Sequence, residues 1–117
     1  MADITIRITE ITGSGVCVTS ALGAEVYNKI YANIKKGNRI ALSFSGITRM
    51  TTAFLNSAVG QLYGEFTEAE IKSFMLPPRD TEAWHLSRLK MVNDRAKQYF
   101  SDRKRYGEVV ERTLGDV

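Results

Sequence analysis

RIALSFSGITRMTTAFLNSAVGQLYGEF, which runs from Arg39 to Phe66, is the stretch of sequence that decides the fold. At its start, Ile40, Leu42 and Phe44 alternate with smaller or polar residues, which is the pattern of a half-buried or central strand. Apolar residues then recur every three or four positions, and this spacing predicts an amphipathic helix that ends near Phe66. The apolar stripe of this helix consists of Phe54, Leu55, Ala58, Val59, Leu62, Tyr63 and Phe66.

A short loop with turn residues and hydroxyl side chains connects this strand to this helix. Ser45-Gly46 favours a turn directly after the strand. Thr51 and Thr52 supply side-chain oxygens that can accept the free N–H groups at a helix start. Because the loop at the carboxyl end of such a strand is where function usually lies, we expect a site at residues 48–56.

The composition limits the classes of protein that this chain can belong to. Its 117 residues suffice for one domain with its own core, and 44% apolar and 25% charged residues are ordinary for a globular protein. A single cysteine fits a reducing cytosol, so we expect a cytoplasmic location. No apolar run is long enough to span a membrane, and the N-terminus lacks the pattern of a secretory signal.

The remaining segments predict a small α/β fold. The alternation of Ile4, Ile6 and Ile8, followed by the Gly13-Ser14-Gly15 turn, predicts a β-hairpin over residues 3–19. The apolar spacing that follows predicts a helix that Gly37-Asn38 terminates. Residues 70–76 are expected to form a strand, with a helix over residues 67–75 as the competing interpretation. The pattern from residue 81 to about residue 105 is helical again.

We therefore expect an α/β domain with a small mixed four-stranded sheet and helices packed against it. Residues 1–106 are expected to form this single domain, and residues 107–117 to form a C-terminal tail. The net charge of +3 is spread along the chain, so charge alone does not predict a nucleic-acid or membrane surface.

No constellation of residues supports an enzyme, a metal site or a cofactor site. His85 and Cys17 are the only histidine and cysteine, which is too few for a metal centre without carboxylates from distant segments. A packed or surface role is the better interpretation of His85, and Cys17 is expected to behave as a small apolar residue in a strand. The chain is therefore expected to be non-enzymatic and to use no cofactor.

A basic cluster near the C-terminus supports an alternative function. Arg103-Lys104-Arg105 lies close to Tyr99, Phe100 and Tyr106, and basic residues interleaved with aromatic ones can bind single-stranded nucleic acid. Acidic neighbours dilute this charge, so a solvated helix surface is the preferred interpretation. Nucleic-acid binding is therefore the second choice.

Thr51-Thr52 permits two compatible interpretations. A threonine at this place caps a helix by accepting an N–H bond. A hydroxyl at a helix start is also a favourable place for a phosphate, because exposed amides and the helix dipole tolerate negative charge there. Arg49 could pair with such a phosphate or with an acidic partner.

The stretch around these threonines resembles a known family. Residues 40–47, IALSFSGI, followed by residues 50–56, MTTAFLN, are similar to the central motif of STAS-like domains. The closer resemblance is to a bacterial STAS-like family of unknown function, and a more distant one is to the anti-anti-sigma factors. The similarity covers about residues 14–100, and its best-matched part is about seventeen residues long.

This resemblance implies a regulatory module that switches between protein partners. Anti-anti-sigma factors are phosphorylated at the start of this helix by an ATPase of the histidine-kinase type, and the phosphate controls partner release. In this sequence the phosphoacceptor position falls on Thr52, and Thr51 replaces the aspartate that precedes it. Ala53 stands where a second serine often occurs, and Ser43 replaces the strand aspartate of the closer family.

The resemblance thus implies a protein partner at the start of the central helix, of which an ATPase of the histidine-kinase type is the example that the anti-anti-sigma factors offer. The expected partner-binding residues are Arg49, Met50, Thr51, Thr52 and Asn56, with Thr52 as the candidate phosphoacceptor. Docking of this kind predicts an exposed, partly apolar patch that also includes Phe54. The sequence does not specify an oligomeric state.

Overall fold

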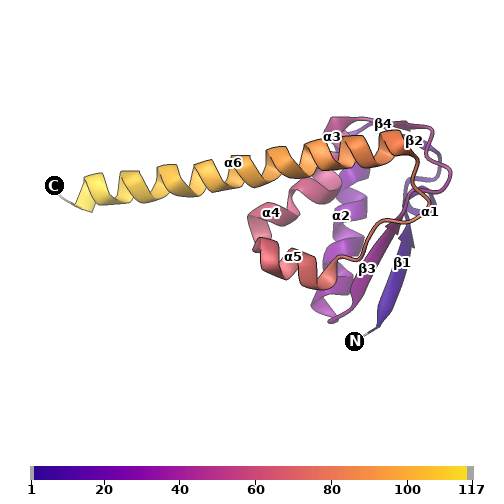
Figure 1. Ribbon diagram of the computed structural model, residues 1–117, viewed down its shortest axis with the longest axis horizontal. Helices are drawn as coiled ribbons and strands as arrows, with labels where there is room; N and C mark the ends of the chain where they lie inside the picture. The colour runs from indigo at the N-terminus through magenta and orange to yellow at the C-terminus, as the bar shows by residue number, and fades with distance from the viewer. Residues whose placement is uncertain (1, 116–117) are drawn as a thin grey trace.

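The computed structural model describes residues 2–115, and it describes the side chains of residues 2–102. Short parallel strands and several helices form a body, from which one long helix extends (Figure 1). The elements in chain order are β1 (Asp3–Arg7), α1 (Ile8–Thr12), β2 (Val16–Cys17), α2 (Ser20–Lys35), β3 (Arg39–Ser43), β4 (Arg49–Met50), α3 (Thr52–Leu55), the π-helix η1 (Asn56–Gly60), α4 (Leu62–Glu65), α5 (Glu68–Phe74) and α6 (Ala83–Gly115).

Strand β3 is the centre of the fold, as its alternating sequence predicts. Ile40 pairs with Ile4 of the parallel strand β1 and also forms a parallel bridge with Met75, so β3 has a neighbour along each edge. The side chains of Ile40, Leu42 and Phe44 are all buried. The strand is therefore covered on its faces by the helices that follow and precede it.

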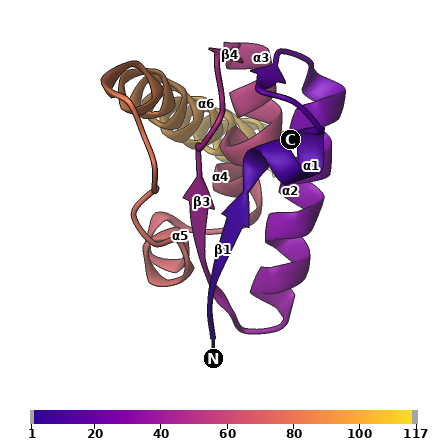
Figure 2. The ribbon, with the colours of Figure 1, turned by 90° about the vertical axis from the view of Figure 1, so that its right-hand side faces the viewer.

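The expected four-stranded sheet is wrong. The structure has two separate two-stranded parallel sheets, β1–β3 and β2–β4. The second sheet is only two residues long in each strand, with Val16 opposite Arg49 and Cys17 opposite Met50. It lies beyond the tips of β1 and β3, where the chain has already left the first sheet (Figure 2).

The expected hairpin over residues 3–19 is also wrong. After β1 the chain turns into the short helix α1, and β1 pairs with β3 instead of β2. Gly13 ends this helix with a φ of 79°, a conformation that glycine adopts without strain, and its N–H donates to the carbonyl of Thr9 at 2.9 Å. Ile8 and Ile11 are three residues apart, a spacing that places both on one face of a helix but on opposite faces of a strand.

Residues 70–74 are helical, so the competing interpretation was the correct one for most of this segment. Thr67 and Glu70 form a capping box at the start of α5: the Thr67 N–H donates to Glu70 Oε1 at 2.9 Å and the Glu70 N–H donates to Thr67 Oγ1 at 3.1 Å. The chain becomes extended only at Met75. From there to Arg79 it runs along β3, with the Leu76 N–H donating to the carbonyl of Ile40 at 2.7 Å.

The two middle helical segments follow the predicted patterns. Helix α2 ends at Lys35, and Gly37 follows it with a φ of 79°. The central helix begins at Thr52 as expected, and both Phe54 and Leu55 are buried beneath it. It is not one regular helix, however, because the π-helix η1 separates α3 from α4.

Helix α6 packs on the body through its first half. Val92 and Ala96 are buried, while Lys90 and Arg95 are exposed, as the apolar spacing predicts. Tyr99, which follows Val92 and Ala96 in the apolar spacing of the helix, is 58% exposed. The neighbouring Phe100 packs against Gly64 of α4 instead. The two are so close that a Cβ atom at position 64 would lie 2.6 Å from the Phe100 ring.

Beyond this contact, α6 continues past Gly107 to Gly115 and extends away from the body (Figure 1). The division into a domain of residues 1–106 and a tail of residues 107–117 stays a prediction. None of the helices described here combines the length and the hydrophobicity needed to cross a lipid bilayer.

Candidate functional site

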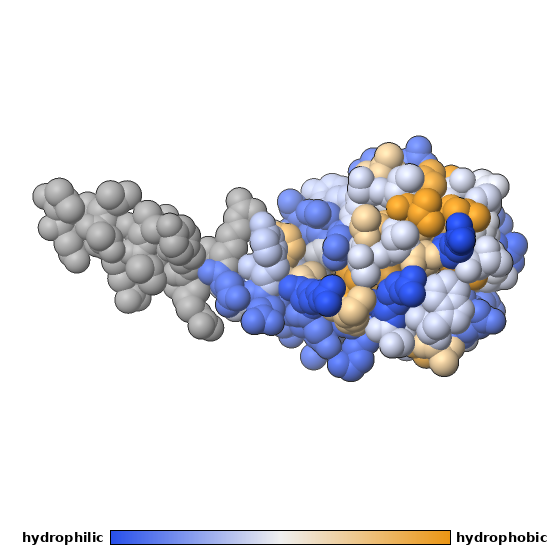
Figure 3. Space-filling model, turned by 90° about the horizontal axis from the view of Figure 1, so that it is seen from above, coloured by the Kyte–Doolittle hydropathy of each residue, from blue (hydrophilic) through white to orange (hydrophobic). Residues whose placement is uncertain are grey.

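The predicted site lies where the second sheet, the start of the central helix and the first turns of α6 meet. The Arg88 guanidinium of α6 donates a hydrogen bond to the carbonyl of Met50 on β4, which fixes α6 to the strand. An open hollow, here called the junction hollow, is lined by Val18, Thr48, Arg49, Met50, Thr51, Trp84 and Arg88. Figure 3 looks down on the face that α6 covers, where hydrophilic and apolar residues alternate over the body.

Thr51 and Thr52 have different roles. Thr51 caps α3, since its Oγ1 accepts the Phe54 N–H at 3.2 Å. The same hydroxyl donates to the carbonyl of Val18 at 2.9 Å, so it also fixes the end of β2 to the helix start. Thr52 is the first residue of α3, its side chain is partly exposed, and its hydroxyl has no hydrogen-bond partner among the residues that the structure describes.

The junction hollow has a positive lining. Arg49 is exposed on β4, and the Arg88 guanidinium lies 5.4 Å from the centre of the Trp84 ring. Trp84 is itself held in place, because its Nε1 donates to Glu82 Oε2 at 2.7 Å. No carboxylate lines the hollow within the described part of the chain. The Glu82 carboxylate lies next to the hollow through its bond to Trp84, but neither guanidinium forms an ion pair with a described residue. Two guanidinium groups without an ion-pair partner suit an anionic group on a ligand or partner.

Two of the predicted site residues do not offer an exposed side chain at the junction hollow. The Met50 side chain is 2% exposed and belongs to the core, so only its backbone carbonyl faces the hollow region. The expected apolar patch is therefore wrong, because Phe54 is buried as well. Asn56 is exposed, but it lines a different hollow together with Arg95 and Tyr99 of α6. The structure thus brings together Arg49, Met50 and Thr51, with Thr52 next to them in the chain.

Sequence reasoning missed the contribution of α6 to this site. Trp84 and Arg88 are four residues apart, a spacing that places both side chains on one face of a helix. That spacing predicts their contact with each other. It does not predict that this face of α6 contacts β4, because the two elements are far apart in sequence.

His85 is a structural residue, as expected for a packed histidine. It is buried, its Nδ1 accepts the Glu82 N–H at 3.0 Å, and its Nε2 lies 3.1 Å from the carbonyl oxygen of Ile47. With the proton on Nε2, both ring nitrogens are satisfied. His85 thereby holds the start of α6 against the loop after β3.

Cys17 faces the core beneath the same site. Its side chain is fully buried, and this burial raises the pKa of the thiol, while a hydrogen bond with Thr12 opposes the effect. A protonated thiol is a poor nucleophile. No group of three or more metal-ligating side chains occurs within the described residues.

Ser43 occupies the position where the strand aspartate of the family was expected. Its Oγ donates to Oδ2 of Asp80 at 2.6 Å, so a carboxylate reaches this place from the segment before α6. Asp80 adopts a φ of 56°, which is uncommon for residues other than glycine but is more frequent for aspartate.

Comparison with known families confirms the resemblance over the middle of the chain. Residues 23–76 match the model of the family described as STAS-like domain of unknown function (DUF4325), which is slightly less than half of the chain. No curated protein and no solved structure matches the sequence. The matched segment runs from α2 to just beyond α5 and includes β4, α3 and the whole loop between β3 and β4. Residues 23–76 are therefore similar to a STAS-like domain of unknown function.

Proposed function

We propose that this protein is a non-enzymatic regulatory module that binds a protein partner at the junction hollow. A STAS-like domain suggests a regulatory protein-interaction module. The observation that carries the proposal is the lining of the hollow, which presents Arg49 and Arg88 without a carboxylate among the described residues. The partner is therefore expected to present an acidic side chain. The cytoplasm, which the single cysteine favours, is the proposed location.

The side chains at the hollow are of the types that stabilise protein interfaces. Tryptophan and arginine are enriched among the residues that contribute most to binding. Trp84 is partly exposed, and its hydrogen bond to Glu82 and its contact with Arg88 fix its orientation before any partner arrives. A fixed side chain loses little conformational entropy on binding. Arg49 forms no ion pair with any described residue, so its charge is available to a partner.

Phosphorylation of Thr52 by an ATPase of the histidine-kinase type is the finer part of this proposal. Thr52 is the better acceptor of the two threonines, because the Thr51 hydroxyl is engaged on both sides. A phosphate adds about −1.5 to −2 charges at neutral pH. Beside Arg49 it would compete with the acidic group of the partner, so phosphorylation would release the partner.

A capture experiment with charge-reversed variants tests the proposal. The protein is immobilised, exposed to an extract of its native cells, and compared with Arg49→Glu. Lys29→Glu is the matched control, because Lys29 is an exposed basic residue on α2. The proposal predicts a partner that binds the parent and Lys29→Glu but not Arg49→Glu. A partner that binds all three equally would overturn it.

The alternative function, nucleic-acid binding through Arg103-Lys104-Arg105, concerns side chains outside those that the structure describes. It stays a prediction. A salt-sensitive affinity for single-stranded DNA that is lost on replacing these three residues would support it over the protein-binding proposal.

A further inference from the structure

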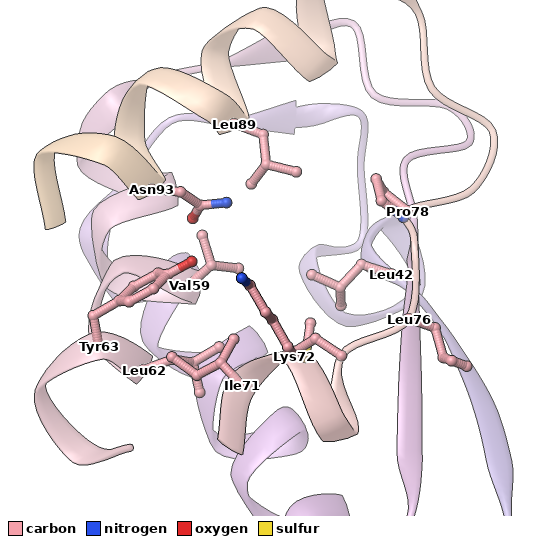
Figure 4. Close-up of a pocket in the computed structure, with 11 residues that line it drawn as sticks. Leu42, Val59, Leu62, Tyr63, Ile71, Lys72, Leu76, Pro78, Leu89 and Asn93 are labelled. Carbon is pink, nitrogen blue, oxygen red and sulfur yellow. The ribbon is translucent and has the colours of Figure 1, made fainter. Parts of the chain in front are cut away.

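A second hollow lies between α5, α6 and β3 (Figure 4). Its volume is about 180 Å³. It shares no lining residue with the junction hollow. Most of its wall is apolar and consists of Leu42, Val59, Leu62, Ile71 and Leu89. We call it the apolar cavity.

Three polar side chains also line the apolar cavity. Tyr63, Lys72 and Asn93 come from three different helices, and Figure 4 shows the polar ends of Tyr63 and Lys72 on the same side of the cavity as Asn93. None of the three forms an ion pair with another described residue. Their polar ends are open to solvent, because no buried side-chain nitrogen or oxygen among the described residues lacks a hydrogen-bond partner. An apolar wall with a few convergent polar groups is the usual form of a small-molecule site.

The charges around the cavity indicate which polar group a ligand carries. Lys72 supplies a cation, and the hydroxyl of Tyr63 and the amide of Asn93 add neutral donors. Glu68 and Asp94 are also near Tyr63, and together with burial they raise the pKa of its hydroxyl, which keeps it protonated as a donor. The charge of Asp94 is balanced by Lys90, whose Nζ lies 2.8 Å from the carboxylate.

The size of the cavity indicates what the rest of the ligand is. A buried apolar cavity of about 150 Å³ is large enough to bind benzene. A volume of about 180 Å³ therefore accepts one aromatic ring or a short branched chain, but not a helix or a long acyl chain. Lys72 is exposed, so the polar end of such a ligand would lie at the open side.

We propose that the apolar cavity binds a small carboxylic acid, with its ring or branched chain against Val59, Leu62 and Leu89 and its carboxylate at Lys72. This site is separate from the protein-binding surface proposed above. Its ligand would contact β3, α5 and α6 together, and these elements are distant in sequence. Binding to the folded state alone would therefore raise the melting temperature.

Three probes of similar shape test this proposal: phenylacetate, 2-phenylethanol and 2-phenylethylamine. Each is titrated into the ¹⁵N-labelled full chain, and Kd is obtained from amide shifts. We expect shifts centred on residues 59–72 and 89–93, with phenylacetate bound about 2- to 5-fold more tightly than the alcohol, as for an ion pair at an exposed lysine. The amine should bind most weakly. No binding, or shifts centred on the junction hollow, would overturn the proposal.

Two variants distinguish the contribution of the Lys72 charge to ligand binding from that of the apolar cavity. Lys72→Gln should remove the preference for phenylacetate over the alcohol while leaving binding of the alcohol unchanged, and Lys29→Gln is the matched control that should change neither. Asn93→Phe should fill the cavity and weaken binding of all three probes. Because Lys72 is exposed, its variant is expected to fold even if Asn93→Phe does not. An unchanged preference in Lys72→Gln would show that the carboxylate binds elsewhere.

Discussion

The junction hollow and the apolar cavity are two depressions on one small body, and their linings are opposite in kind. The junction hollow is open, and its polar side chains hold one another in place, as Thr51, Trp84 and Arg88 show. The apolar cavity has an apolar wall and three polar groups that form no ion pair within the described chain. A rigid, positively charged surface suits a macromolecular partner, whereas a small cavity with free donors suits a small molecule.

This difference arises from how α6 meets the body. Its first turns are fixed to β4 and to the loop after β3, through Arg88 and His85. Farther along, the side chains of α6 do not fill the space between this helix, α5 and β3. The apolar cavity occupies that space. The same helix therefore builds one wall of each hollow.

Phe54→Ala should have the largest effect on stability, because it weakens the core that supports both hollows. Phe54 is completely buried in the core cluster that also contains Met50 and Val59, which line the junction hollow and the apolar cavity respectively. Removal of its ring should lower the free energy of unfolding by about 3–5 kcal/mol. Urea denaturation measures this change, with Tyr99→Ala as the exposed aromatic control. A loss below about 1 kcal/mol would contradict the described core.

Thr51→Ala should weaken the structure at the junction hollow and leave the apolar cavity unchanged. It removes the cap of α3 and the hydrogen bond to the Val18 carbonyl, so the free energy of unfolding should fall by about 0.5–2 kcal/mol. Thr52→Ala, the matched control, should change it by less than about 0.5 kcal/mol. Equal losses in the two variants would mean that the caps are assigned wrongly. In Thr51→Ala, binding of phenylacetate at the apolar cavity should be unaffected.

Tyr63→Phe should have the smallest effect on the free energy of unfolding, and this effect should be seen only at alkaline pH. Burial, together with Glu68 and Asp94, raises the pKa of Tyr63 above its ordinary value of 10.0. The folded state therefore keeps this proton when the unfolded state has begun to lose it. The stabilisation is complete below about pH 10 and is lost as pH rises through the higher pKa of the folded state.

The free energy of unfolding of the parent should therefore fall above about pH 10, and Tyr63→Phe should show a shallower fall. Urea denaturation over this range measures both slopes, and Tyr99→Phe controls for loss of an exposed phenol. Identical slopes in the parent and in Tyr63→Phe would show that the Tyr63 hydroxyl is not enclosed in the way that the structure describes.

The sequence predicted the elements whose signals are local. The alternation from Ile40 to Phe44 and the apolar spacing after Thr52 each report burial within one element, and both predictions are confirmed. The resemblance to a STAS-like domain rests on the same stretch and is confirmed over residues 23–76. The start of the central helix, and with it the place of Thr51 and Thr52, was also predicted.

The errors concern pairing and contacts between distant segments. Residues 3–19 alternate as a hairpin would, yet β1 pairs in parallel with β3, a partner that follows α2 in the chain and that local alternation does not identify. At residues 70–76, the capping box of Thr67 and Glu70 outweighed an imperfect alternation. Trp84 and Arg88 belong to the site only because α6 folds back onto β4, and no local pattern encodes that contact.

The central claim is that an acidic partner docks at the junction hollow, and one affinity measurement tests it most directly. The partner captured with the parent protein is titrated, at fixed ionic strength, against the parent, Thr52→Glu and Ser101→Glu. Ser101 is an exposed position on α6, so its variant has the same added charge at a distance from the hollow. The account predicts that Thr52→Glu binds at least about tenfold more weakly, with an unchanged melting temperature, while Ser101→Glu binds like the parent. Equal affinities for all three would contradict docking at this site.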